Sequence, residues 1–175
     1  MTMDAPNAVE RLARVLDAAR TRYAIIGGHA VNSWLEPRFT ADIDVTVAAD
    51  VAELTRLRDL LSQSGYVVTR EYGADLPSGP DFVRWTSSEG DVVELQLAKT
   101  EFQEQVIRRA VVGSRGAKVA TPEDLVVLKL IADRAKDRID LEGLVALESL
   151  DWAYVEHWAR QWDVLDRLER VRAGR

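Results

Sequence analysis

Apolar residues recur along this chain at two spacings, and these predict where helices and strands form. Spacings of three and four residues predict helices over 7–20, 29–35, 51–64, 100–112, 122–134, 137–148, 151–161 and 163–173. Short apolar or alternating runs predict strands over 23–26, 42–47, 66–71, 82–86, 91–97 and 118–120. The pattern therefore indicates an α/β front followed by an α-helical back.

Two of the predicted helices carry strong end signals. Asp50 and Glu53 have the spacing of a capping box, and Gly65 is the residue expected just beyond the end of that helix. Thr121 is the expected N-cap of a later helix, with Pro122 at its first position. These signals predict both ends of the helix over 51–64 and the start of the helix over 122–134.

The composition limits the classes of protein that fit. The chain has 175 residues, 47% of them apolar and 30% charged, which fits one globular domain or a small core with a helical extension. A net charge of −6 argues against a surface built as a whole for nucleic acid, but not against a local basic groove. The absence of cysteine excludes disulfides and zinc–thiolate sites. With no signal-peptide pattern and no apolar run near about 18 residues, we expect a cytoplasmic protein with no membrane partner.

Two carboxylates stand on the strand predicted over 42–47. Side chains alternate along a strand, so Asp42 and Asp44 point to one face while Ile43 and Val45 point to the other. Like charges side by side repel each other, and bound Mg²⁺ would compensate them because hard cations take oxygen ligands. Taken alone, the pair fits a solvated strand edge as well as a metal site.

A glycine pair precedes these carboxylates. Gly27 and Gly28 follow a short apolar strand and open a helix, where a bare backbone allows the close approach of a phosphate. The stretch IIGGHAVNSWLEPRFTADIDVTV resembles the nucleotidyltransferase superfamily related to DNA polymerase beta. Its small bacterial members share an Arg-x-Thr-x-Asp-x-Asp pattern, which starts here at Arg38 and Thr40. The resemblance implies a nucleotidyltransferase fold, with a small mixed sheet flanked by helices and a helical C-terminal part.

The resemblance also implies a third carboxylate on a neighbouring strand. Within 91–97 we expect Val93 and Leu95 to face the core, which turns Glu94 to the open side. Asp91 lies one residue out of that alternation and is the reserve candidate. Relatives often carry Asp at this position, so the longer Glu94 side chain leaves the metal geometry open.

A single lysine interrupts the apolar helix that begins after Thr121. Lys129, Asp133 and Lys136 fall on one face if the helix continues. The segment TPEDLVVLKLIADRAKDRID looks like the C-terminal motif of AbiEii-type nucleotidyltransferases, the toxin halves of certain toxin–antitoxin pairs. On that resemblance Lys129 contacts the triphosphate, while Asp137 or Asp140 orients a base or a basic side chain.

The resemblance implies an enzyme that moves a nucleoside monophosphate from an NTP such as ATP to an acceptor hydroxyl, with Mg²⁺ or else Mn²⁺. The residues that it makes catalytic and metal-binding are Asp42, Asp44 and Glu94. The residues that it assigns to the nucleotide are Gly27, Gly28, Arg38, Thr40, Lys129 and Asp137. We expect 1–120 to be the catalytic core and 121–175 a helical part that completes the nucleotide cleft, in one compact unit.

The sequence leaves three alternatives for the function open, two of which differ in the acceptor. A toxin-like enzyme would modify RNA, for example a tRNA 3′ end, and would have an antitoxin protein as partner. A small antibiotic nucleotidyltransferase would bind a cationic aminoglycoside, or a lincosamide, and for an aminoglycoside the acids available are Asp75, Asp81, Glu89 and Asp91. The third alternative is a non-catalytic binding module that keeps the fold.

Overall fold

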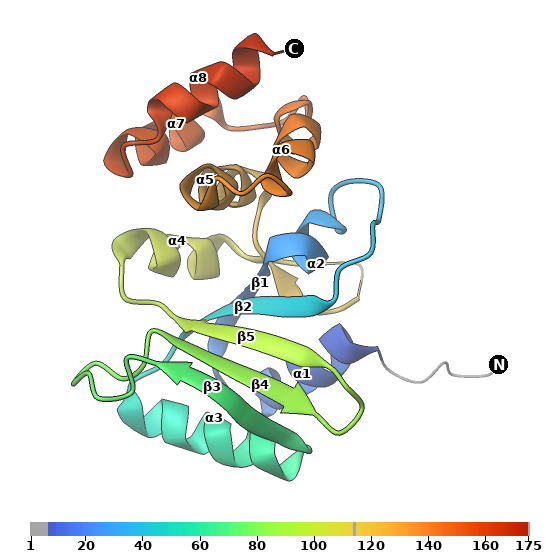
Figure 1. The fold of residues 1–175 in the computed structure, drawn as a ribbon, viewed down its shortest axis with the longest axis vertical. Helices are drawn as coiled ribbons and strands as arrows, with labels where there is room; N and C mark the ends of the chain where they lie inside the picture. Colours follow the sequence, from blue (N-terminus) through green and yellow to red (C-terminus); the bar gives the residue numbers. More distant parts are fainter. Residues whose placement is uncertain (1–6, 114, 175) are drawn as a thin grey trace, which may run out of the picture.

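The computed structural model describes residues 7–113 and 115–174. Its helices are α1 (Ala8–Ala18), α2 (Gly27–Val31), α3 (Val51–Gln63), α4 (Glu101–Arg109), α5 (Pro122–Ala132), α6 (Asp137–Val145), α7 (Trp152–Gln161) and α8 (Leu165–Ala173). Its strands are β1 (Arg22–Ile26), β2 (Asp42–Ala48), β3 (Tyr66–Tyr72), β4 (Phe82–Ser87), β5 (Val92–Leu97), β6 (Val111–Val112) and β7 (Lys118–Val119). Figure 1 shows this order of elements along the chain.

All the strands join one mixed sheet, in the order β3-β4-β5-β2-β1-β7-β6. The pairs β2–β5 and β1–β7 are parallel, and the other neighbouring pairs are antiparallel. In Figure 1, α3 lies below the sheet and α1 lies behind it, whereas α4 and the C-terminal helices lie above β1 and β2. The mixed sheet, the flanking helices and the helical C-terminal part confirm the predicted fold class.

The hydrophobic core follows the predicted alternation. Ile43, Val45 and Val47 on β2 are at most 1% exposed, and Val93 and Leu95 on β5 are fully buried. Burial of each such side chain contributes about 1.5–3 kcal/mol. Because these residues fill the core on one face, the polar residues between them point to the opposite face.

The predicted helix ends are confirmed. Asp50 and Glu53 form the capping box of α3, and Gly65, just beyond that helix, has a positive φ of +85°. At α5 the Thr121 hydroxyl accepts a hydrogen bond from a backbone N–H of the first turn, and Pro122 is the first helical residue.

The structure corrects the limits of several predicted helices. The helix expected over 29–35 is the short α2, and the chain then turns so that the Trp34 indole N–H donates to the carbonyl of Ala120. The helix expected to reach residue 112 ends at Arg109, because Val111 and Val112 pair with β7 instead. Smaller differences shorten the helices expected over 7–20, 122–134, 137–148 and 163–173.

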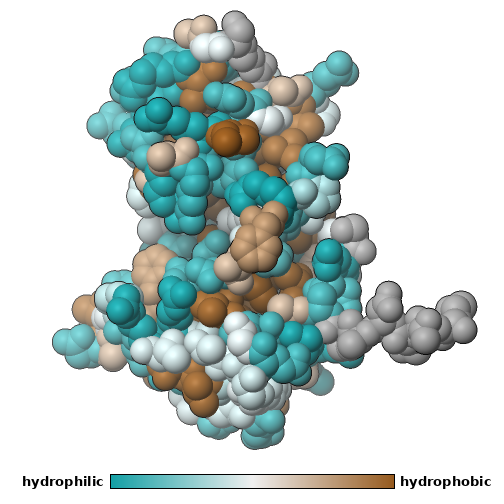
Figure 2. All heavy atoms as spheres, turned by 45° about the vertical axis from the view of Figure 1, so that its right-hand side comes forward, coloured by the Kyte–Doolittle hydropathy of each residue, from teal (hydrophilic) through white to brown (hydrophobic). Residues whose placement is uncertain are grey.

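Hydrophilic side chains cover most of the face shown in Figure 2, with apolar atoms exposed in small groups between them. In the part of the chain that the structure describes, no helix combines the length and the apolar character that crossing a bilayer requires.

Candidate active site

The parallel pairing of β2 with β5 brings the predicted carboxylates together. Asp44 is the register partner of Glu94, and Asp42 is two residues away on the same face of β2. Asp91 instead lies in the turn before β5, where it accepts a hydrogen bond of 2.6 Å from Arg11. The structure thus brings Glu94, and not the reserve candidate Asp91, next to Asp44.

The glycine turn packs directly against this carboxylate strand. β1 runs antiparallel to β2 and ends opposite Asp44, so Gly27 follows at that position. Gly27 has a φ of +64°, and a Cβ there would lie 2.0 Å from the Oδ2 atom of Asp44. A Cβ on Gly28 would lie 2.6 Å from the Thr40 hydroxyl oxygen. The close approach of the two segments therefore requires glycine at both positions.

Gly27→Ala is expected to destabilise the protein and to displace the carboxylate of Asp44. Gly90→Ala is a matched control, because Gly90 has a φ of +87° and open space around its Cβ position. The control should lose about 1–2 kcal/mol from the left-handed backbone alone. Urea unfolding should show a clearly larger loss for Gly27→Ala; equal losses would mean that the contact with Asp44 is unimportant.

Asp44 stands in an environment that disfavours its charge. Burial, with added repulsion from Glu94 and Asp42, raises the pKa of Asp44 to about 6, although Arg134 and Lys136 act in the opposite direction. A cation near this carboxylate would relieve the repulsion. The cluster has the oxygen-donor chemistry that Mg²⁺ prefers.

Arg84 is a member of this cluster that sequence reasoning missed. Its guanidinium lies 2.5 Å from a carboxylate oxygen of Glu94 and 3.7 Å from one of Asp42. In residues 7–113 and 115–174, no group of three or more His, Cys, Asp or Glu side chains is placed to hold a metal ion. The carboxylate oxygens are the donors that a divalent cation takes, but as they are placed they do not converge on one ion, and Arg84, which pairs with two of them, would have to move aside.

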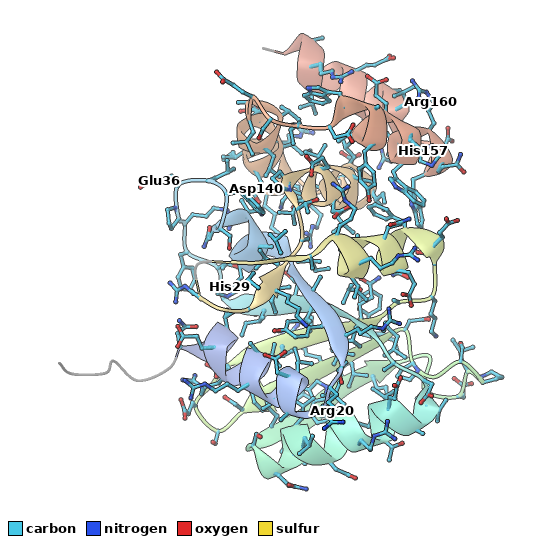
Figure 3. All side chains as sticks on the ribbon, turned by 180° about the vertical axis from the view of Figure 1, so that it is seen from behind. Arg20, His29, Glu36, Asp140, His157 and Arg160 are labelled. Atoms are coloured by element: carbon cyan, nitrogen blue, oxygen red, sulfur yellow. The ribbon has the colours of Figure 1, made fainter. Side chains whose placement is uncertain are left out.

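A buried ion network links the C-terminal helices to the loop before β2. Lys129 on α5 is 4% exposed, and its ammonium lies 2.9 Å from Asp137 and 2.6 Å from Asp140 on α6. Arg134 bonds Asp137 at 2.7 Å, and Arg38 bonds Asp140 at 2.6 Å. Figure 3 labels Asp140, a residue of α6 on the side of that helix that faces the loop after α2. Both arginines are much more exposed than the lysine.

The acids of this network remain ionised. Burial alone would raise the pKa of Asp137 and of Asp140, but hydrogen bonds from Lys129 and the arginines outweigh it and lower both values. The expectation that Lys129, Asp133 and Lys136 share one helix face is wrong. α5 ends at Ala132, and its C-cap Asp133 adopts a left-handed conformation with a φ of +47°, so the chain turns before Lys136.

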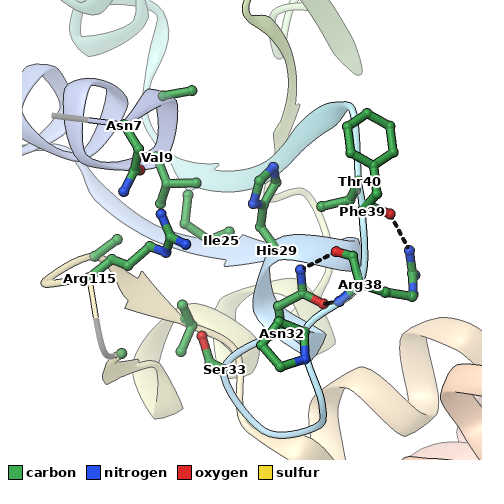
Figure 4. Close-up of a pocket in the computed structure, with 15 residues that line it drawn as sticks. Asn7, Val9, Ile25, His29, Asn32, Ser33, Arg38, Phe39, Thr40 and Arg115 are labelled. Carbon is green, nitrogen blue, oxygen red and sulfur yellow. Dashed lines mark hydrogen bonds between the residues drawn. The ribbon is translucent and has the colours of Figure 1, made fainter. Parts of the chain in front are cut away.

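A hollow of about 390 Å³ lies beside the glycine turn (Figure 4). His29, Arg38 and Thr40 are among the residues that line it, but the carboxylates are not. Asn32 holds its rim, since its amide donates to the carbonyl of Arg38 at 2.7 Å and accepts from the Arg38 backbone N–H at 3.1 Å. Burial, with a contribution from Arg115, lowers the pKa of His29. The hollow brings together two residues predicted to bind nucleotide, Arg38 and Thr40.

Several solved structures share this fold. The solution structure of the antibiotic-resistance factor ANT(2'')-Ia has a TM-score of 0.61 and 15% identity, with 95% of this chain and 96% of that chain covered. An antigenic nucleotidyltransferase-like protein from Paracoccidioides brasiliensis has a TM-score of 0.54 and 19% identity, over 93% of this chain and 89% of that chain. The Megavirus polyadenylate synthase has a TM-score of 0.53 and 15% identity, over 86% of this chain and 34% of that chain.

A search of the curated proteins finds no significant match to this sequence. The family described as "Nucleotidyltransferase of unknown function (DUF6036)" matches residues 7–173. This match spans the glycine turn, the carboxylate strands and the buried ion network. The chain belongs to this nucleotidyltransferase family.

Proposed function

We propose that this protein transfers a nucleoside monophosphate from an NTP to an acceptor hydroxyl and releases pyrophosphate, with Mg²⁺ or Mn²⁺ as cofactor. The observation that carries the proposal is the pairing of Asp44 with Glu94 on adjacent parallel strands, with Asp42 on the same face. Gly27 packs against Asp44, so a backbone free of side chains adjoins the carboxylates. The family match and the shared fold support the same reaction class.

In this proposal Asp42, Asp44 and Glu94 hold the divalent cation. A bound cation supplies charge neutralisation for the triphosphate and lowers the pKa of the attacking hydroxyl. Glu94 is at the open edge of the cluster, with a side chain 38% exposed, and would accept the proton of the acceptor hydroxyl. Gly27 and Gly28 would let phosphate oxygens approach the backbone closely.

The buried network gives Lys129 a positioning role in the proposal. Its charge is taken up by Asp137 and Asp140, so we assign the direct triphosphate contacts to Arg38 and Arg134. Arg134 is near enough to interact electrostatically with Asp44. In this arrangement the core at 1–120 supplies the carboxylates and the helical part at 121–175 supplies the network that orients the arginines.

For the acceptor, we favour RNA over an aminoglycoside. Three of the four acids expected to attract a cationic drug are paired within the protein: Asp81 pairs with Lys99, and Asp91 pairs with Arg11. Glu89 pairs with the same arginine. We extend the proposal to an AbiEii-like toxin with an antitoxin partner on the resemblance of the segment around Lys129. The likeness to ANT(2'')-Ia keeps an antibiotic acceptor as the second candidate.

Calorimetry with each NTP, with and without Mg²⁺, tests the reaction class. We expect binding that requires the metal, because a bound cation would offset the repulsion of Glu94 and Asp42 on Asp44. Nucleotide binding that is absent, or that is the same without metal, contradicts the enzyme proposal. The second of these outcomes would favour the non-catalytic module.

Incubation with α-labelled NTPs identifies the acceptor. We expect label in total RNA and none in a panel of aminoglycosides and lincosamides. Label in the antibiotics alone would overturn the RNA assignment and leave the reaction class intact. A small protein encoded in the neighbouring reading frame that suppresses the RNA labelling would support the toxin–antitoxin reading.

A further inference from the structure

The sheet face that carries the carboxylates continues beyond them toward its β3 edge. The strand register aligns side chains from four strands in two rows on this face. The first row contains Asp44, Glu94, Arg84 and Arg70. The second row contains Thr46, Gln96, Phe82 and Tyr72. Both rows run from β2 to the β3 edge of the sheet. We name the four side chains at that edge the distal face, namely Arg70, Tyr72, Phe82 and Arg84.

The distal face is open to solvent. Tyr72 is 53% exposed and Phe82 is 42% exposed, which is unusual for two aromatic side chains on adjacent strands. Arg70 donates a hydrogen bond of 3.0 Å to the Tyr72 hydroxyl, and its guanidinium lies 5.8 Å from the centre of that ring. In Figure 1 the C-terminal helices lie over β1 and β2 and leave this edge of the sheet uncovered.

The distal face is also physically continuous with the carboxylates. A hollow of about 200 Å³ is lined by all four of its residues together with Glu94 and Val83. Phe82 and Tyr72 extend into a second hollow, which is lined also by Gln96 and Lys99. An acceptor that lies in these hollows would therefore reach Glu94 directly.

The chemistry of the distal face selects one class of acceptor. Two guanidinium groups bind phosphates, and exposed aromatic rings stack on unpaired bases of any sequence. A polycationic drug would instead meet two arginines, and the acids beside them are already paired, Glu94 with Arg84 and Asp81 with Lys99. We propose that the distal face binds the unpaired end of a polynucleotide and directs its terminal hydroxyl to Glu94. This inference rests on the proposed nucleotidyl transfer, and it adds the substrate class and the residues that select it.

Fluorescence anisotropy without added NTP tests the binding step alone. The probes are a short labelled single-stranded RNA, the DNA of the same sequence and a blunt duplex. We expect Arg70→Gln, Tyr72→Ala and Phe82→Ala each to weaken single-strand binding about tenfold, and Tyr72→Trp to retain it. Arg70→Gln should also reduce the salt dependence by about 0.7 in logarithmic slope.

The matched controls lie on α3, on the other side of the sheet. Arg56→Gln removes the same charge from an exposed position, and Val51→Ala shortens an exposed apolar side chain. Both should bind as the unchanged protein does. Thermal unfolding of every variant checks that the exposed substitutions leave the fold intact.

Each outcome separates this inference from the reaction class. The inference is supported if Arg70→Gln, Tyr72→Ala and Phe82→Ala weaken single-strand binding while the controls on α3 do not. Comparison of the RNA and DNA probes then shows which polynucleotide supplies the bound end. Binding of the duplex alone, or equal binding by all variants, overturns it, even where NTP binding requires metal. If the distal face binds single strands but no metal-dependent NTP binding occurs, the proposed reaction fails and the binding face stands.

Discussion

Asp44→Asn is expected to reduce nucleotide transfer at least about a thousandfold while leaving the protein folded. Under the proposed function the variant would lose a metal ligand at the centre of the carboxylate cluster, and the charge stabilisation that a bound cation supplies amounts to several kcal/mol. The fold should tolerate the change well. The raised pKa of Asp44, about 6, means that its ionisation opposes folding. The stability of the metal-free protein therefore falls as the pH rises from the ordinary value of 3.8 to about 6, and Asn removes that cost.

Transfer of label from an α-labelled NTP measures this prediction, and urea unfolding at two pH values measures the stability. Asp59→Asn is the matched control, since Asp59 is exposed on α3, away from the cluster. The control should keep full activity. Retained transfer by Asp44→Asn would show that the carboxylates are assigned wrongly.

Lys129→Met is expected to destabilise the protein by about 3–5 kcal/mol, because it leaves two buried carboxylates without their shared cation. Methionine has a similar length and removes the charge. The pKa of Asp137 and of Asp140 should rise in the variant. In the unchanged protein their lowered pKa values add stability that persists above the ordinary value and is lost as the pH falls through the lowered one. The variant should therefore lose less stability than the unchanged protein when both are acidified.

Urea unfolding at neutral and at acid pH measures the effect of Lys129→Met. Lys118→Met makes the same change at an exposed lysine, whose ammonium lies 5.4 Å from the centre of the Tyr23 ring, and should cost under about 1 kcal/mol. Transfer assays add a second readout. If Lys129 instead contacts the triphosphate directly, the variant would lose NTP affinity with little loss of stability.

Local patterns in the sequence correctly predict which side chains of the carboxylate strands share a face. Alternation places Asp42 and Asp44 on one face of β2, and the same argument selects Glu94 over Asp91 on β5. These predictions succeed because a strand with one buried face allows a single assignment of its side chains.

The sequence patterns do not predict, by contrast, which side chains of distant segments pair with each other. Alternation within β4 turns Arg84 to the open face, but only the register of β4 against β5 places it beside Glu94. The partners of Lys129 were hidden for a similar reason. The left-handed turn at Asp133 ends α5, and Asp137 and Asp140 then return from a second helix.

The helix limits failed where tertiary contacts outweigh local preference. Residues 29–35 have helical spacing, yet the helix stops after Val31 and Trp34 bonds the carbonyl that follows β7. Val111 and Val112 favour strand structure through their branched side chains, and β7 offers them an edge to pair with.

The bond between Arg38 and Asp140 spans 102 residues of sequence, which bears on how the protein is made. Chains fold from the N-terminus while they leave the ribosome, and contacts of long separation form last. A nascent chain can complete β2 and β5 long before Asp140 is synthesised. Arg38 then lacks its partner, so the loop between α2 and β2 is fixed only after α6 has been made. Under the proposed function, Arg38 would be oriented toward the triphosphate only from that stage onward.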